Sequence, residues 1–249
     1  MVHVLAAGRT ERGHVRPINE DGFLTLPPVF AVADGMGGHQ GGEIASRIAL
    51  QVMGDFARRG PWSAAGLAGA VELANQEIRA AARKPEWQGM GTTLTAALWD
   101  GTALHLVHVG DSRAYLLREG QPLLQLTQDH SIAGELLTSG LIDSETARHH
   151  PQRHILTRAL GVFEKAAADQ VSLTPSAGDI VLLCTDGLTG VLAPSEVELA
   201  LRRPGSLEHK VKRLVRWANA RGGPDNITAL ALTWVSGNQL ETGEGEARS

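Results

Sequence analysis

Cysteine and long hydrophobic runs are scarce in this sequence. Its one cysteine, Cys184, excludes an internal disulfide and a cysteine-based zinc cluster. Because Cys184 stands in the apolar run 180–184, we expect a buried, inert thiol and not a nucleophile. No run is long enough to cross a membrane, and residues 2–7 lack the charged start of a signal peptide. These absences favour a cytoplasmic protein with no membrane partner.

Positive charge is also in short supply. The chain has 23 Lys and Arg against 27 Asp and Glu, and its net charge is −4. Nucleic-acid binding depends on cationic contacts to phosphates, so this balance argues against a nucleic-acid partner. The basic stretches 202–203 and 209–213 are typical of solvated helix faces. With 249 residues, 43% of them hydrophobic, the chain suits one large domain or two small ones.

Short β runs dominate the chain, with helices in three places. Strands are expected at 3–8, 22–26, 29–33, 92–98, 104–109, 114–117, 123–126, 155–160, 167–173, 179–185 and 226–235. Helices are expected at 43–58, 63–83, 130–140, 143–149, 195–203 and 207–221. Strands that follow one another through short turns indicate antiparallel pairing and not the strand–helix alternation of a parallel sheet.

The pattern predicts an α+β fold. Two antiparallel sheets packed together, with a helix pair on each outer face, would bury every apolar face in a four-layer α-β-β-α sandwich. Residues 129–161 break the rhythm and predict an inserted, partly mobile subdomain. Residues 237–249 have no apolar pattern and predict a disordered tail. We therefore expect a single domain over 1–236.

Four aspartates share a position at the end of an expected strand: Asp34, Asp111, Asp186 and Asp225. Asp34 lies between a stiff apolar strand and a glycine-rich turn that begins at Gly35. Glycine lets both a carboxylate and a backbone carbonyl approach an ion closely. One Asp-Gly pair usually forms only a turn. The four aspartates together predict one oxygen-rich metal site.

Eight short motifs occur in a fixed order along the chain. They are RPINED at 16–21, ADGMGG at 33–38, GTT at 91–93, HVGDSR at 108–113, LTQDHS at 126–131, ILTRALG at 155–161, TDGL at 185–188 and GPDNIT at 223–228. Together they resemble the PPM/PP2C metal-dependent serine/threonine phosphatases in their bacterial form. The resemblance extends over about residues 10–231, nearly the whole chain, so it is highly specific.

The resemblance implies hydrolysis of phosphoserine and phosphothreonine at two tightly bound Mn²⁺ or Mg²⁺ ions. It assigns the bridging carboxylate to Asp34, with the Gly35 carbonyl on one ion. Asp186 and Asp225 would be ligands of the other ion. Two such ions, roughly 3.5–4 Å apart, activate a shared water for attack on phosphorus. Oxygen ligands of this kind suit hard ions and not zinc.

The resemblance gives five further residues supporting roles. Glu20 and Asp21 would hold metal-bound waters or support the ligands, and Asp111 would take a third, weaker ion. Arg16 would grip the substrate phosphate, since a guanidinium can bond two phosphoryl oxygens at once. Asn226 would support the ligands from behind. His105 and His108 alternate with apolar residues and are expected to pack without binding metal.

The proton donor for the leaving oxygen stays open. Some family members have a histidine directly after the Asp-Gly pair, where this chain has Met36. His39, three residues further on, and a metal-bound water are the candidates. A solvent-exposed turn histidine with no chemical role is the alternative interpretation of His39.

The resemblance also implies a partner class. Residues 129–161 correspond to the family's flap, which helps to choose substrates. The expected partners are phosphorylated proteins, including an opposing Ser/Thr kinase, and the expected assembly is a monomer. Two alternatives are a catalytically inactive relative that acts as a binding module and a hydrolase of small phosphoesters. The intact acidic positions favour an active enzyme.

Overall fold

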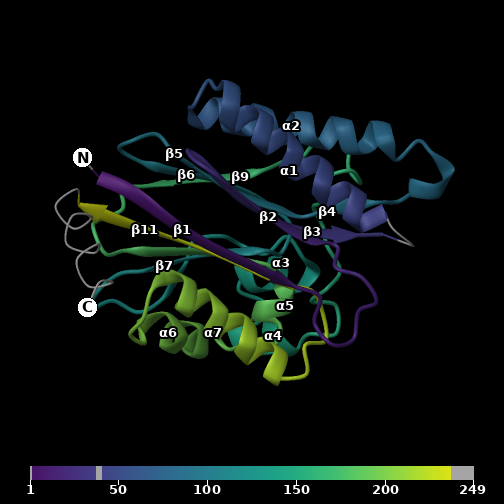
Figure 1. Cartoon of the computed structure of the whole chain (residues 1–249). Helices are drawn as coiled ribbons and strands as arrows, with labels where there is room; N and C mark the ends of the chain where they lie inside the picture. Colours follow the sequence, from purple (N-terminus) through teal and green to yellow (C-terminus); the bar gives the residue numbers. More distant parts are fainter. Residues whose placement is uncertain (1, 38–40, 237–249) are drawn as a thin grey trace.

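The computed structural model describes residues 2–37 and 41–236 (Figure 1). The tail predicted at 237–249 and His39 lie outside these ranges. One antiparallel sheet has the order β1 (Val2–Glu11), β11 (Ile227–Ser236), β10 (Ile180–Cys184), β7 (Arg113–Leu117) and β8 (Leu124–Gln125). The other has the order β2 (Asp21–Leu26), β3 (Val29–Met36), β5 (Leu94–Trp99), β6 (Leu104–Val109) and β9 (Asp169–Leu173), with β4 (Gly91–Thr92) beside β3.

Helices cover the outer face of each sheet (Figure 1). The helices α1 (Gly41–Arg59) and α2 (Ala64–Ala81) lie on the β3 sheet, and α6 (Pro194–Arg202) and α7 (Leu207–Ala220) lie on the β11 sheet. Local signals start two of them: the Ser63 hydroxyl accepts the Gly66 N–H at 3.1 Å, and Pro194 occupies the first turn of α6. A 3₁₀ turn (Pro85–Trp87) follows α2, and the short α5 (Asp186–Thr189) follows β10.

The alternation of side chains along β3 links two of the three apolar layers. Val29, Ala31 and Ala33 pack toward α1 and α2, whereas Phe30 and Val32 pack between the two sheets. All five are fully buried. A third layer joins the β11 sheet to α6 and α7. Each fully buried side chain of the Val, Leu or Phe type contributes about 1.5–3 kcal/mol. The α+β fold with two antiparallel sheets is therefore confirmed, and the helix pairs give it four layers.

The strand predicted at 92–98 is interrupted at Thr93, which separates β4 from β5. The Thr93 N–H donates to the Asp34 carbonyl at 2.9 Å, and the Thr93 hydroxyl accepts the Asp34 N–H at 3.1 Å. These two bonds draw the chain out of regular pairing and around Asp34. The interruption therefore belongs to the architecture of the site.

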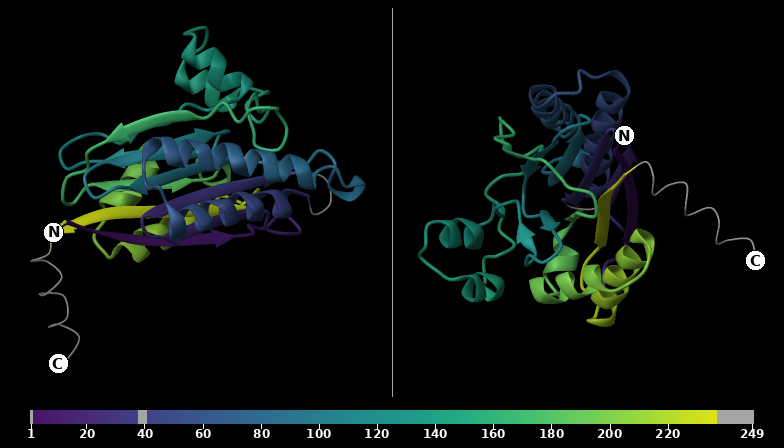
Figure 2. Two further views of the ribbon diagram at one scale, coloured as in Figure 1. Left: turned by 90° about the horizontal axis from the view of Figure 1, so that it is seen from above. Right: turned by 90° about the vertical axis from the view of Figure 1, so that its left-hand side faces the viewer.

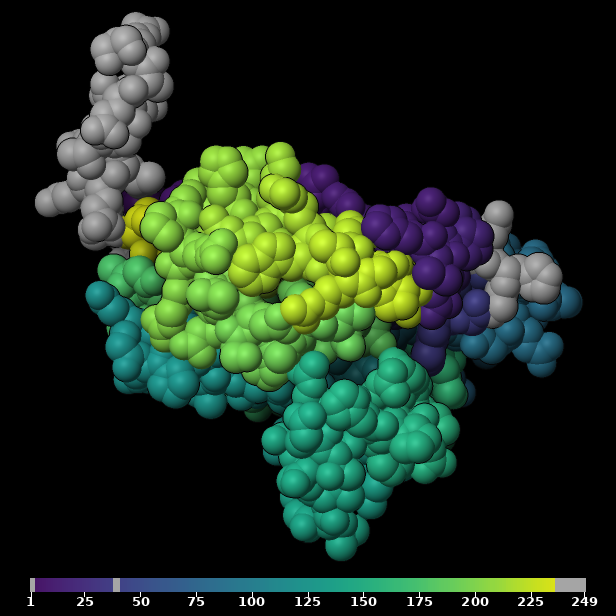
Figure 3. Space-filling model, turned by 90° about the horizontal axis from the view of Figure 1, so that it is seen from below, coloured from purple at the N-terminus to yellow at the C-terminus, as the bar shows by residue number. Residues whose placement is uncertain are grey.

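Residues 129–161 project from the sheets (Figure 2) and form the teal protrusion of Figure 3. They contain α3 (Ile132–Thr138) and α4 (Ser144–His149), close to the predicted helices. The strand predicted at 155–160 is wrong, because this stretch makes only single bridges, from Leu156 to Ser131 and from Leu160 to Thr92. Its backbone is satisfied by loop partners, so no ladder forms. In the described part of the chain, no helix is long and apolar enough to cross a membrane.

Candidate metal centre

The topology brings five of the predicted acidic residues together from five strand ends. Asp34, near the end of β3, lies opposite Asp21, the first residue of β2. Asp186 begins α5 directly after β10, and Asp225 precedes β11 by two residues. Asp111 lies in the turn between β6 and β7. Their proximity shows in the pKa of Asp34, which is raised by burial and then by the charges of the other four.

Asp34 and Gly35 are held by backbone contacts. The Asp34 carbonyl accepts the Thr92 hydroxyl at 2.8 Å in addition to the Thr93 N–H. The Gly35 N–H donates to the Glu20 carbonyl at 3.2 Å. A Cβ on residue 35 would stand 2.1 Å from the Gly42 carbonyl oxygen, so only glycine fits there. The carboxylate is therefore presented from a backbone with little freedom to move.

Two buried carboxylate oxygens lack a hydrogen-bond partner among the described residues: Asp21 Oδ1 and Glu20 Oε1. The second oxygen of Asp21 accepts the hydroxyls of Thr185 and Thr228, both at 2.7 Å. A buried carboxylate oxygen without a partner is costly, and a cation is the partner that offsets this cost. These orphaned oxygens fit a metal site.

Burial and mutual repulsion disfavour ionisation of the cluster. Burial raises the pKa of Asp21 to about 7. Burial and the neighbouring charge of Asp186 raise the pKa of Asp111 well above its ordinary value. Carboxylates held close together in a buried place ionise readily only beside positive charge. An all-oxygen donor set favours Mg²⁺ or Mn²⁺.

As the side chains stand, no group of three or more His, Cys, Asp or Glu residues within 2–37 and 41–236 is arranged to hold an ion. Two of the expected ligands lie beside an arginine or histidine side chain instead. Asp225 Oδ2 lies 2.8 Å from the Arg16 guanidinium, and Asp186 Oδ2 lies 3.6 Å from His154 Nδ1. Each of these contacts uses only one oxygen of the carboxylate, Oδ2.

Arg16 and Asn226 join residues 12–20 to the Asp225 loop. The bond to Asp225 raises the pKa of the Arg16 guanidinium, which stays half exposed. The Asn226 amide donates to the Arg12 and Ile18 carbonyls, both at 2.9 Å, and accepts the Glu20 N–H at 2.8 Å. One amide therefore fixes the loop that carries both Arg16 and Glu20.

The two strand histidines make polar contacts with groups outside the acidic cluster. Burial lowers the pKa of His108 to about 4, and its ring bonds the Thr95 hydroxyl at 2.9 Å and the Gln128 carbonyl at 3.0 Å. His105 pairs with Asp100 at 2.8 Å on the surface. Sequence reasoning missed His154 and Thr93, which lie beside Asp186 and Asp34. The GTT motif was the signal for Thr93, whereas no local pattern singles out His154.

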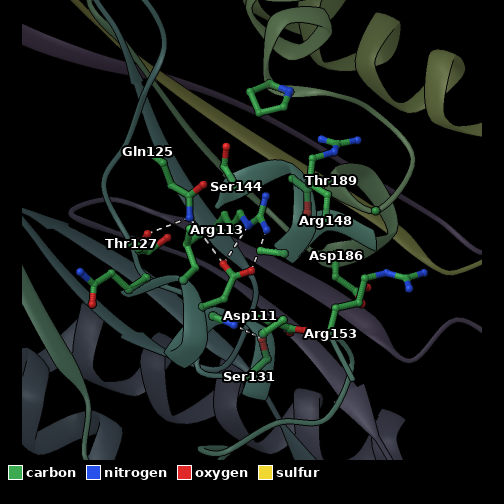
Figure 4. Close-up of a pocket in the computed structure, with 18 of the residues that line it drawn as sticks. Asp111, Arg113, Gln125, Thr127, Ser131, Ser144, Arg148, Arg153, Asp186 and Thr189 are labelled. Carbon is green, nitrogen blue, oxygen red and sulfur yellow. Dashed lines mark hydrogen bonds and ion pairs between the residues drawn. The ribbon is translucent and has the colours of Figure 1, made fainter. Parts of the chain in front are cut away.

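A cavity of about 620 Å³ lies between residues 129–161 and the α5–α6 region (Figure 4). Asp111 and Asp186 form part of its wall, and Arg148, Arg153 and His154 contribute from the projecting segment. The cavity is large enough for several side chains of a peptide. Of the acidic cluster, Asp111 and Asp186 face this cavity.

Comparisons with known proteins agree with this geometry. The family model for "Protein phosphatase 2C" matches residues 22–231. Serine/threonine phosphatase stp of Listeria monocytogenes is 38% identical over 240 residues, which are 90% of this chain and 93% of that protein. Serine/threonine protein phosphatase PstP of Mycobacterium tuberculosis is 41% identical over 235 residues, 92% of this chain but 45% of that longer protein.

Solved structures show the same fold. The crystal structure of the catalytic domain of PstP in complex with two manganese ions has a TM-score of 0.87 at 37% identity, and covers 95% of this chain and 100% of that one. Stp1 from Staphylococcus aureus also gives a TM-score of 0.87, at 29% identity, and covers 94% of this chain and 96% of that one. The chain belongs to the protein phosphatase 2C family and is a metal-dependent serine/threonine protein phosphatase.

Proposed function

We propose that this phosphatase works at a centre of two Mn²⁺ or Mg²⁺ ions held by Asp34, the Gly35 carbonyl, Asp186 and Asp225. Glu20 and Asp21 position the waters of this centre, and Asp111 takes a third, weaker ion. The observation that carries the proposal is the pair of buried, orphaned oxygens, Asp21 Oδ1 and Glu20 Oε1, beside carboxylates of raised pKa. The two manganese ions in the PstP catalytic domain support the count.

When bound, the ions lower the pKa of an attacking water and neutralise charge on the phosphoryl oxygens. The residues of the chain orient the ester. Arg16 uses one N–H on Asp225, at 2.8 Å, and keeps further donors for two phosphoryl oxygens. The water oxygen bonds to phosphorus and gives up a proton, the bond from phosphorus to the serine or threonine oxygen breaks, and that oxygen takes a proton, so that an alcohol and inorganic phosphate are formed.

The proton donor is a separate part of the proposal. Met36 cannot supply a proton, and His39 lies outside the described residues. The structure adds His154, whose Nδ1 is 3.6 Å from Asp186 and which lines the cavity. We propose His39, His154 or a water of the centre as the donor.

The substrates are phosphorylated proteins, among them an opposing Ser/Thr kinase, and they enter through the cavity beneath the flap at 129–161. The charge of that cavity supports this proposal. Arg113 and Asp129 neutralise each other at 2.6 Å, and Glu145 pairs with His149 at 3.1 Å. Arg148 donates to the Leu192 carbonyl and Arg153 to the His150 carbonyl, both at 3.4 Å, and neither lies within 4 Å of a described carboxylate in an ion pair. They are therefore free to attract acidic residues that flank the phosphorylated side chain.

Hydrolysis of a phosphothreonine peptide with Mn²⁺, with Mg²⁺ and with EDTA tests the proposed centre. Turnover should require a divalent ion and should disappear with EDTA. Asp111→Ala should keep two tightly bound ions yet lose turnover, whereas Asp186→Ala should lose a tight site. Calorimetric metal counting that finds the same loss of a tight site in both variants would refute the separate role of Asp111.

A further inference from the structure

Two motifs whose roles are unassigned, LTQDHS at 126–131 and ILTRALG at 155–161, meet at His130. This side chain is buried, with 3% of its surface exposed. It lies behind the turn that carries Asp111, against the His108 ring at 4.8 Å between centroids. A buried imidazole with several polar neighbours has a defined orientation and a defined tautomer.

The contacts of His130 fix that tautomer. The Gly110 N–H donates to His130 Nδ1 at 3.1 Å, so Nδ1 is an acceptor and carries no proton. Burial lowers the pKa of His130, which favours the neutral ring. The ring proton therefore resides on Nε2, which donates to Asp169 Oδ2 at 3.1 Å. The backbone reinforces the pairing, because the His130 N–H donates to the Gly110 carbonyl at 2.7 Å.

The flap is joined to the same ring through Asp169. Arg158 Nη1 donates to Asp169 Oδ1 at 2.7 Å, and the Thr157 N–H donates to the His130 carbonyl at 2.9 Å. Arg158 Nη1 is also 3.2 Å from His130 Nε2, but both nitrogens are donors in this tautomer. The attraction between Arg158 and His130 therefore acts through Asp169, and it ties the returning end of the flap to the ring.

On its other side, His130 acts on the catalytic turn through Gly110. Gly110 has φ +112°, and a Cβ there would stand 2.5 Å from the Thr93 side chain, so the turn has one accessible shape. Thr93 bonds the Ser112 hydroxyl at 2.7 Å and the Asp34 N–H at 3.1 Å. The next residue, Asp111, is buried with its carboxylate in the cavity wall. The position of Gly110 therefore sets that of Asp111.

We propose that His130 is a positioning residue that couples the flap to Asp111. When Arg158 and Asp169 are paired, Asp169 orients the imidazole, and the imidazole holds Gly110 so that Asp111 faces the centre. When the flap is displaced, Asp169 loses Arg158 and the restraint on Gly110 weakens. The coupling to turnover rests on the role proposed above for Asp111, whereas the hydrogen-bond relay from Asp169 to Gly110 does not.

Two amide substitutions separate the two ends of the relay. In His130→Asn the amide oxygen can replace Nδ1 as acceptor for Gly110, but the side chain is too short to reach Asp169. In His130→Gln the amide nitrogen can replace Nε2 as donor to Asp169, but the acceptor for Gly110 is lost. Hydrogen exchange of the Gly110 amide in the metal-free protein should quicken about fivefold or more in His130→Gln and should stay near wild type in His130→Asn, because one hydrogen bond of ordinary strength is lost only in the former.

Activity on a phosphopeptide then tests the coupling. In the wild-type background, Asp169→Asn should lower kcat for the phosphopeptide about fivefold and leave KM for p-nitrophenyl phosphate unchanged. In the His130→Asn background, Asp169→Asn should cause no further fall in kcat. Equal exchange in the two His130 variants, or independent effects of Asp169→Asn and His130→Asn, would overturn the proposal. If the His130 variants do not fold, Arg158→Lys and Asp169→Asn give the same test from the half-exposed side, through Gly110 exchange. If Asp111 has no role in turnover, Asp111→Ala will turn over substrate normally. The differences in Gly110 hydrogen exchange between the His130 variants will still be seen in that case.

Discussion

The two walls of the catalytic cleft are built differently. On the β3 wall, Asp34 is held by the backbone and hydroxyls of Thr92 and Thr93, and it follows the fully buried run 29–33 of its strand. On the flap wall, α3 and α4 contribute few buried side chains and project away from the sheets (Figure 2). The first wall carries the carboxylate to which the proposed function gives the central metal-binding role. The second wall presents half-buried or exposed arginines, which suits the choice of substrates.

The largest effect should come from removing the Asp34 carboxylate of the β3 wall. Asp34→Ala removes the carboxylate that we propose both ions share, so peptide hydrolysis should fall by about a thousandfold, the upper end of the range for one electrostatic group. The variant should fold, since the alanine relieves a buried carboxylate of raised pKa. Circular dichroism checks the fold and phosphopeptide turnover with Mn²⁺ checks the activity. Substantial turnover by folded Asp34→Ala would contradict the assignment.

The proton donor also bears on the difference between the two walls. One histidine candidate, His39, follows the β3 strand in the sequence, and the other, His154, belongs to the flap. A serine or threonine alkoxide gains about 10²–10⁴-fold from protonation, whereas nitrophenolate needs little help. The variant that removes the donor, His39→Ala or His154→Ala, should slow phosphopeptide hydrolysis by about a hundredfold and leave p-nitrophenyl phosphate hydrolysis nearly unchanged. It should also remove one limb of the pH–rate profile for the peptide. Equal effects on both substrates in both variants would assign the proton to a water of the centre.

The flap wall should act mainly on substrate preference. Arg148→Ala with Arg153→Ala should raise KM about tenfold for phosphopeptides with acidic flanks, because both charges that attract those flanks are lost. Phosphopeptides with neutral flanks and p-nitrophenyl phosphate should change little. Arg59→Ala, at the exposed end of α1, is the matched control for loss of surface charge. An equal rise in KM for acidic and neutral peptides would argue against this role.

The smallest expected effect is on the stability of the metal-free protein. The folded pKa of Asp21, about 7, lies above its ordinary value of 3.8. Between these values the folded state retains a proton that the unfolded state has lost, so stability falls as pH rises through this window. The free energy of unfolding in EDTA should therefore be lower at pH 8 than at pH 5, by on the order of a few kcal/mol.

Denaturant unfolding of two variants checks this slope. Asp21→Asn should reduce it, and Asp34 and Asp111, whose pKa values are also raised, should keep part of it. Asp100→Asn should not reduce it, because Asp100 is a surface residue whose pKa is lowered to about 2 and which titrates outside the window. Saturating Mn²⁺ should stabilise the protein more at pH 8, where the ligands are ionised. A slope that is unchanged by Asp21→Asn would place the pH dependence elsewhere.

Most of the β3 wall could be predicted from patterns among neighbouring residues in the sequence. The buried strand at 29–33, the glycine after Asp34 and the aspartates at strand ends are local features, and the eight ordered motifs identified the family. The opposition of Asp21 to Asp34 depends on strand register, and the break at Thr93 depends on contacts to Asp34. Neither can be read from residues that are adjacent in the chain.

The flap wall was harder to predict for the same physical reason. Its two helices begin after the N-cap residues Ser131 and Asp143, which are local signals, and both helices were predicted. The strand at 155–160 was not found in the structure, although Ile155, Leu156 and Thr157 suit a strand, because no neighbouring strand pairs with them. The contact of His130 with Asp169 joins residues 39 positions apart. Such contacts follow from tertiary packing and leave no local signal.

The central claim is that Asp34 bridges two ions, and anomalous scattering from crystals grown with Mn²⁺ measures this directly. The account predicts two strong manganese peaks per chain, both in contact with the Asp34 carboxylate. One should also contact the Gly35 carbonyl, and the other Asp186 and Asp225. A single strong peak, or two peaks of which only one contacts Asp34, would contradict the account.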